Sequence, residues 1–180
     1  MKLVRWLGTA AVGLAIMAAG HYGIDAVFHP WAYPVLRGST PIGAWSGMLS
    51  SPDGAQHRVF LNLIHENRSG DDNSPAITGE VQVCPLSRYE PSRGNIGGRA
   101  SWTGARLELN LYATFGKFGT LTNVPCGWQR DSLACTFDFS RHYNEQVEAA
   151  ARKAGIMTKY RPIRVDFQRH TTMPQSCASQ

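Results

Sequence analysis

The chain has 180 residues, 43% of them hydrophobic, and its 18 Lys and Arg against 13 Asp and Glu give a formal net charge of +5. This is enough for one domain plus an appendage. The apolar content excludes an intrinsically disordered chain, and the mixed composition excludes collagen, a coiled coil and a multi-span membrane protein.

The first element expected is an apolar helix over residues 6–24, a stretch without Asp, Glu, Lys or Arg. As a helix it spans roughly 28 Å, close to the roughly 30 Å hydrocarbon core of a bilayer. Lys2 and Arg5 precede it and Asp25 follows it, so the positive-inside rule keeps the N-terminus in the cytoplasm. We expect residues 1–24 to anchor a bacterial inner-membrane protein, single-pass, with its C-terminal domain in the periplasm.

Cleavage of this segment is the alternative. Ala18 and Gly20 provide small residues at the positions that signal peptidase prefers, and cleavage after Gly20 would release a periplasmic or secreted protein. Residues 25–40 follow, rich in aromatic side chains and interrupted by Pro30 and Pro34. They are expected either to form a tether near the lipid headgroups or to pack on the domain as a terminal strap.

Beyond residue 40 the hydrophobic period is two, which is typical of β-strands with one buried face. Residues 106–111 alternate without error, as do residues 133–139 and 163–168. Turn-forming residues separate such runs at short intervals. Eight strands are expected, at residues 41–50, 55–65, 76–84, 95–103, 105–113, 119–129, 132–140 and 160–169.

Eight short antiparallel strands joined in sequence predict a mainly β domain, a meander that closes into a small barrel over residues 41–170. The period changes to that of a helix between Ser140 and Gly155, so one α-helix is expected before the last strand. Residues 171–180 are left as a C-terminal tail.

The four cysteines all fall in the part predicted to be exported, where disulfides persist. Cys126 and Cys135 are symmetric about Arg130-Asp131, which places them opposite each other in a two-residue hairpin and within disulfide range. We predict a Cys126–Cys135 disulfide, and the remaining cysteines are then assigned to each other by default: Cys84 and Cys177.

The segment Pro41-Ile42-Gly43-Ala44-Trp45-Ser46-Gly47 resembles the Gly-x-Trp opening of small calycin-type barrels, the lipocalins and avidins. Trp-containing segments around Trp102 and Trp128 are similar to their repeated hairpins. The resemblance implies a barrel shape. No second or third lipocalin signature and no set of avidin-like biotin contacts accompany it, so the resemblance does not imply a ligand.

No chemistry-bearing motif emerges. The six histidines lack metal-ligand spacing, and no metal or cofactor site is expected. A Gly-x-Ser-x-Gly elbow is missing, and the central glutamates Glu80 and Glu108 alternate with apolar residues, which predicts a wet outer face. An enzyme with a dispersed site is therefore kept only as the second alternative.

Charge is unevenly distributed along the chain. Residues 26–140 carry nine basic and nine acidic side chains, whereas residues 141–180 carry seven basic and three acidic ones. A basic patch is predicted for an acidic protein partner or anionic lipid: Arg152, Lys153, Lys159 and Arg161. The alternative is a solvated helix face. Nucleic acid is not expected as a partner.

Three tryptophans are candidates for a ligand cavity, although core packing is their ordinary role: Trp45, Trp102 and Trp128. Together these features predict a non-catalytic envelope binding protein, such as an inhibitor, an immunity-type protein or an accessory protein. The alternative is a calycin-like carrier of a small apolar ligand.

Overall fold

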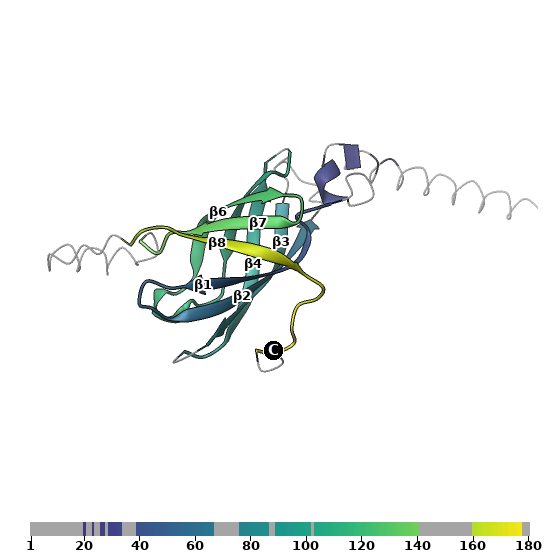
Figure 1. Cartoon of the computed structure of the whole chain (residues 1–180). Coiled ribbons are helices and arrows are strands. Elements are labelled where there is room, and N and C mark those ends of the chain that lie inside the picture. Colours follow the sequence, from purple (N-terminus) through teal and green to yellow (C-terminus); the bar gives the residue numbers. More distant parts are fainter. Residues whose placement is uncertain are drawn as a thin grey trace, which may run out of the picture.

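A computed structural model describes residues 20, 23, 26, 27, 29–33, 39–66, 76–86, 89–101, 103–140 and 160–177. The described residues form a closed eight-stranded barrel in which every neighbouring pair of strands is antiparallel (Figure 1). Its strands are β1 (Gly43–Ser50), β2 (Gln56–Glu66), β3 (Ala76–Pro85), β4 (Ser92–Ala100), β5 (Arg106–Leu111), β6 (Leu121–Gln129), β7 (Ser132–Phe137) and β8 (Ile163–His170). The predicted eight-stranded meander is confirmed, and the barrel is compatible with a calycin-like architecture.

The alternation in the sequence sets the inward faces of the strands. Leu107, Leu109 and Leu111 of β5 are buried, while the residues between them are partly exposed. The inward side chains of all eight strands join one continuous hydrophobic core that fills the barrel. The predicted outward positions of Glu80 and Glu108 are also confirmed, since each forms an exposed ion pair with an arginine of β4.

Strand β4 starts at Ser92, three residues earlier than the predicted start at residue 95. The sequence Pro91-Ser92-Arg93-Gly94 is typical of a turn, but Gly94 has a different role here. A Cβ at this position would lie 2.2 Å from the carbonyl oxygen of Tyr112, so glycine allows close approach of the neighbouring backbone. The prediction therefore failed because a packing requirement had been interpreted as turn chemistry.

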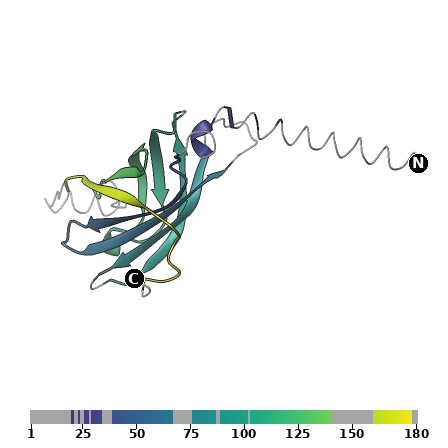
Figure 2. The same cartoon turned by 45° about the vertical axis from the view of Figure 1, so that its right-hand side comes forward.

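Both predicted disulfides are confirmed. Cys126 and Cys135 are directly opposed in the β6–β7 ladder, with Cα atoms 4.0 Å apart, and both are buried on the inner face. Cys84 of β3 faces outward and bonds Cys177, at a Cα separation of 5.4 Å. Residues 171–177, here called the tail strap, therefore leave β8 and cross the outside of the barrel to β3 (Figures 1 and 2).

One end of the barrel, here the Trp31 end, is closed by the short 3-10 helix η1 (Pro30–Ala32) (Figure 2). Trp31 is fully buried and belongs to the hydrophobic core. Gly104, in the turn between β4 and β5, lies so close that a Cβ on it would be 2.4 Å from Cγ of Trp31. Of the two interpretations of residues 25–40, the described residues around Trp31 thus follow the packed strap.

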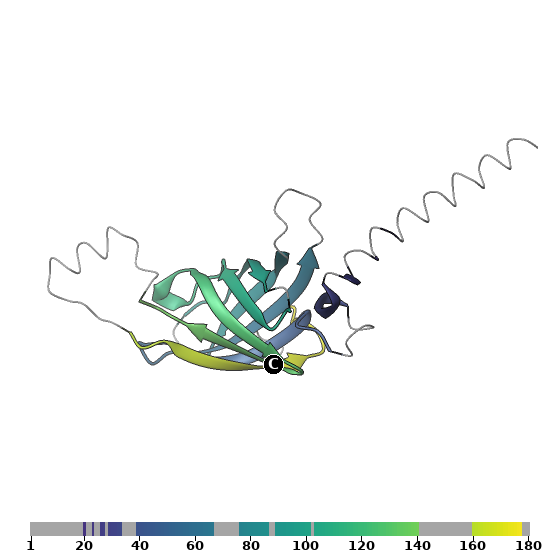
Figure 3. The ribbon, with the colours of Figure 1, turned by 90° about the horizontal axis from the view of Figure 1, so that it is seen from above.

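The opposite end, here the Ser51 end, is closed by aromatic rings. Phe118 of the 3-10 helix η2 (Gly116–Phe118) lies 4.8 Å from Phe139 and 5.6 Å from Tyr160, measured between ring centroids. The β1–β2 turn and the chain preceding β4 lie at this end as well. In the view from above, β8 runs beside β1, with which it pairs (Figure 3).

Two predicted helices lie almost entirely outside the described residues. Of the apolar helix at 6–24 only Gly20 and Gly23 are described, and of the helix between Ser140 and Gly155 only Ser140. The part of the chain that the structure describes contains no helix long and apolar enough to cross a membrane.

Candidate functional site

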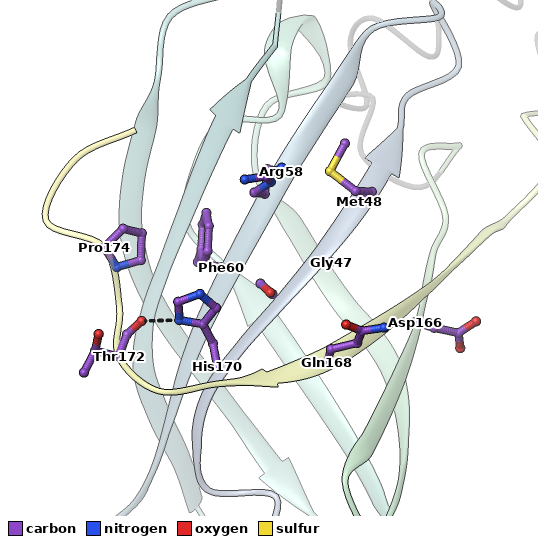
Figure 4. A pocket seen from close by; sticks show the side chains of 10 residues that line it. Gly47, Met48, Arg58, Phe60, Asp166, Gln168, His170, Thr172 and Pro174 are labelled. Atoms are coloured by element: carbon purple, nitrogen blue, oxygen red, sulfur yellow. Dashed lines mark hydrogen bonds between the residues drawn. The ribbon is translucent and has the colours of Figure 1, made fainter. Parts of the chain in front are cut away.

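A concavity on the outer surface of the barrel is here called the strap groove. It has a volume of about 670 Å³. Its floor comes from the outer faces of β1, β2 and β8, and the tail strap forms one wall (Figure 4). The lining residues are Ser46, Gly47, Met48, Arg58, Phe60, Asp166, Gln168, His170, Thr172 and Pro174.

The tail strap shapes this groove by covering an outward-facing part of the sheet. Phe60 points outward from β2, yet only 2% of it is exposed, and its ring lies edge-on to His170 at 5.7 Å. His170 in turn contacts the backbone carbonyl of Thr172 through Nδ1 at 2.7 Å, which fixes the start of the strap. The far end is fixed by the Cys84–Cys177 disulfide.

The open side of the strap groove combines apolar and charged groups. Met48 is 47% exposed and places an apolar side chain at the surface of the groove. Arg58 and Asp166 flank it from neighbouring strands (Figure 4), and Asp166 is itself paired with Arg164 at 3.2 Å. The groove thus offers an apolar anchor, an aromatic floor and charges of both signs.

The predicted tryptophans are separated by the fold. Trp45 is fully buried, its Nε1 donates to the carbonyl oxygen of Pro41 at 2.8 Å, and its ring carries the Arg169 guanidinium at 4.1 Å. Trp128 is buried in the same core opposite Leu133. Trp102 lies outside the described residues. Both described tryptophans therefore serve the core.

Arg169 is one of the seven basic side chains of residues 141–180, and in the structure it packs at the Trp31 end of the barrel. Besides stacking on Trp45, it donates hydrogen bonds to the carbonyl oxygens of Ile42, at 2.6 Å, and Thr40. Burial lowers the pKa of Arg169, and the nearby charge of Asp131 opposes that shift. The alternation of β8 could have indicated this position, because Arg169 lies on the same inward face of the strand as Val165 and Phe167.

The basic patch is represented in the described chain by Arg161 alone, which is exposed just before β8. Arg152, Lys153 and Lys159 lie outside the described residues, so the patch remains a prediction.

A second polar cluster lies at the Ser51 end and is here called the Ser51 cluster, consisting of Ser51, Asp53, His57 and Tyr89. Ser51 Oγ lies 2.6 Å from Asp53 Oδ1 and 3.2 Å from His57 Nε2. The Tyr89 hydroxyl donates to Asp53, and the Tyr89 ring stacks on His57 at 5.9 Å. His57 is fully buried and Ser51 is 4% exposed.

The Ser51 cluster contains serine, histidine and aspartate but does not have the geometry of a hydrolytic triad. In a triad the carboxylate holds the imidazole, whereas here Asp53 accepts its hydrogen bonds from Ser51, Tyr89 and the Ala55 amide. The nucleophile candidate is also buried in the turn. The arrangement therefore fastens the β1–β2 turn and offers no surface to a substrate.

Hydrogen bonds and burial set the protonation states of Asp53 and His57 in this cluster. Partial burial alone would raise the pKa of Asp53, but donation by Ser51, Tyr89 and the Ala55 amide, together with the charge of Lys117, lowers it to about 2. Burial lowers the pKa of His57, and the negative charge of Asp53 partly opposes this effect. At neutral pH the cluster thus contains a carboxylate and a neutral imidazole.

No protein-family model, curated protein or solved structure matches the chain. Among the described residues, no group of three or more His, Cys, Asp or Glu side chains is placed to hold a metal ion. The strap groove is the candidate functional site because of its volume, its wall formed by the tail strap and its exposed Met48.

Proposed function

We propose that the protein is a non-catalytic binding protein of the bacterial envelope, held at the inner membrane by residues 6–24, which presents the outer surface of its calycin-like barrel to another envelope protein. The observation that supports this most is the strap groove, a concavity of about 670 Å³ outside the barrel with an exposed apolar anchor, Met48. Inhibitor, immunity-type and accessory roles all use such a surface.

Packing inside the barrel favours this function over a carrier of a small apolar ligand. Trp31 and Trp45 fill one end, Phe115, Phe137 and Phe139 fill the other, and all five side chains are fully buried. The buried Cys126–Cys135 disulfide, which joins β6 to β7, packs in the same core. A carrier needs interior space for its cargo, typically several hundred Å³.

Native mass spectrometry of the protein purified from membranes of its own host distinguishes these functions. A stoichiometric protein partner that stays bound supports the proposal. A co-purifying small molecule, with no protein bound, contradicts it and supports the carrier.

The basic patch gives the proposal a second test. Reversal of two of its charges, Arg152→Glu with Lys153→Glu, is expected to weaken binding to anionic liposomes or to the partner more at low salt than at high salt, because salt screens exposed charges. Unchanged binding at both salt concentrations would limit these residues to a solubilising role.

A further inference from the structure

The Ser51 cluster fastens the turn that joins the end of β1 to the start of β2. Within this turn the Ser51 amide donates to the Ala55 carbonyl at 2.8 Å and the Gly54 amide donates to the Ser51 carbonyl at 2.9 Å. Ser51 Oγ and Asp53 add the side-chain bonds described above. The imidazole of His57 reaches this turn from the first residues of β2, so it links the turn to the barrel core.

The protonation state of the imidazole follows from counting hydrogens. Ser51 Oγ has one proton, and two of its neighbours only accept: the ionised Asp53 carboxylate at 2.6 Å and the Ala55 carbonyl at 2.9 Å. That proton is taken by one of these acceptors, so His57 Nε2 has to donate to Ser51 Oγ. Neutral His57 therefore carries its proton on Nε2 and a bare lone pair on Nδ1.

Nδ1 is where a second proton would go, and its surroundings disfavour that proton. The atom is buried and has no hydrogen-bond partner among the described residues. Leu49 of β1 and Pro85 of β3 are paired with His57 and are apolar. The titratable groups around the ring are Asp53 and Tyr89, with Lys117 beyond Asp53; the carboxylate is already engaged by Ser51 and Tyr89.

We propose that the Ser51 cluster is an acid-sensitive latch: protonation of His57 at Nδ1 destabilises the closed β1–β2 turn and shifts this turn, at the Ser51 end of the barrel, toward an open form. A buried N–H without an acceptor costs free energy in the closed state, and hydration of the imidazolium in the open state removes that cost. Acid thus shifts the turn toward its open form.

The latch also reaches the strap groove. Met48 and Arg58 are paired partners in the β1–β2 ladder, immediately next to the Leu49–His57 pair. Opening of the turn therefore changes the spacing of two groove residues. This consequence for binding rests on the proposed function, whereas the latch itself does not.

Hydrogen exchange of the full chain between about pH 8 and about pH 5 tests the latch, because His ordinarily changes charge in this interval. After correction for the intrinsic pH dependence of exchange, the amides of Ser51 and Gly54 are expected to lose protection with acid. The opening equilibrium rises up to about tenfold per pH unit while one proton is taken up on opening.

Two variants supply the controls. His57→Gln offers an amide N–H to Ser51 but does not titrate, so its turn amides are expected to exchange independently of pH over this range. His170→Gln removes an exposed imidazole of the strap groove and is expected to keep the wild-type response. Acid-induced loss of protection that persists in His57→Gln would overturn the latch, as would wild-type protection that does not change with pH.

Nitrogen NMR of the wild-type imidazole tests the same step without any variant. The proposal expects Nδ1 unprotonated and Nε2 protonated at neutral pH, and the opposite tautomer would overturn it. Neither measurement involves a partner, so failure of the latch is distinguishable from failure of the proposed function.

Discussion

The contact between Trp31 and Gly104 at the Trp31 end gives the most quantitative prediction. Gly104 has φ = +70°, and an added Cβ would lie 2.4 Å from Cγ and 2.6 Å from Cβ of Trp31. Gly104→Ala is therefore expected to cost about 1–2 kcal/mol through the left-handed backbone. The steric conflict with the indole adds about 1–3 kcal/mol.

The matching change on the other side is Trp31→Ala. The indole is fully buried, and its Nε1 has no hydrogen-bond partner among the described residues. Removing the indole therefore lowers stability through lost packing contacts. Truncations of this kind cost about 3–5 kcal/mol. Trp31→Ala removes the conflict of the added Cβ with the indole ring, whereas the conflict with Cβ of residue 31, at 2.6 Å, remains because alanine keeps that atom. The double variant is therefore expected to lose about 1 kcal/mol less stability than the sum of the two single losses.

The assay is equilibrium denaturation of the full-length chain in a mild detergent, carried out as a double-mutant cycle. Gly54→Ala provides the control, because Gly54 also has positive φ, +83°, but an added Cβ meets nothing within 4 Å. Its cost is expected to be the same with and without Trp31. Costs of Gly104→Ala and Trp31→Ala that add within about 0.5 kcal/mol would refute the packing of Trp31 in the barrel.

Further predictions concern the two disulfides, Arg169 and pH. Loss of Cys84–Cys177, which closes a separation of 93 residues, is expected to cost about 4.7 kcal/mol, and loss of Cys126–Cys135, with a separation of 9, about 2.6 kcal/mol. The variant without Cys84–Cys177 should therefore have the lower melting temperature, and the reverse order would contradict this. Arg169→Met keeps an apolar stem but removes the charge over Trp45 and the hydrogen bonds to backbone carbonyls. Denaturation should therefore show that the free energy of unfolding falls by about 2 kcal/mol. An unchanged free energy would contradict a stabilising role for Arg169. The pKa of His57 is lower in the folded state than in the unfolded chain. The contribution of His57 to stability is therefore present above about pH 6.5 and declines as the pH falls below that value. Melting curves of the wild type and of His57→Gln, compared across this pH range, test this.

The sequence predicted those parts of the fold that depend on local alternation. The alternation of Leu107, Leu109 and Leu111 predicts a strand because every second side chain enters the core. The spacing of Cys126 and Cys135 predicts a hairpin and its disulfide. Local signals fail where two distant segments decide the conformation. Gly94 illustrates this, since it has to be glycine because of the backbone of Tyr112, the residue that follows β5.

The candidate site depended even more on distant contacts. The strap groove exists because the chain crosses from His170 to Cys84 over the outside of the barrel. The default pairing of Cys84 with Cys177 predicted the end of that path but not the groove beside it. The Ser51 cluster and the position of Arg169 had a usable signal. His57 and Arg169 are polar residues at inward positions of alternating strands, and such positions demand a specific partner when the strand is folded.

Site-specific photo-crosslinking in the native host tests the central claim most directly, with the photoreactive side chain placed at Met48 in the strap groove. Tyr112 is the control, because it is 53% exposed on β5's side of the barrel and outside the groove. The account predicts a discrete protein adduct from Met48 and none from Tyr112. Equal labelling from both positions, or no protein adduct from Met48, would contradict a binding face at the strap groove.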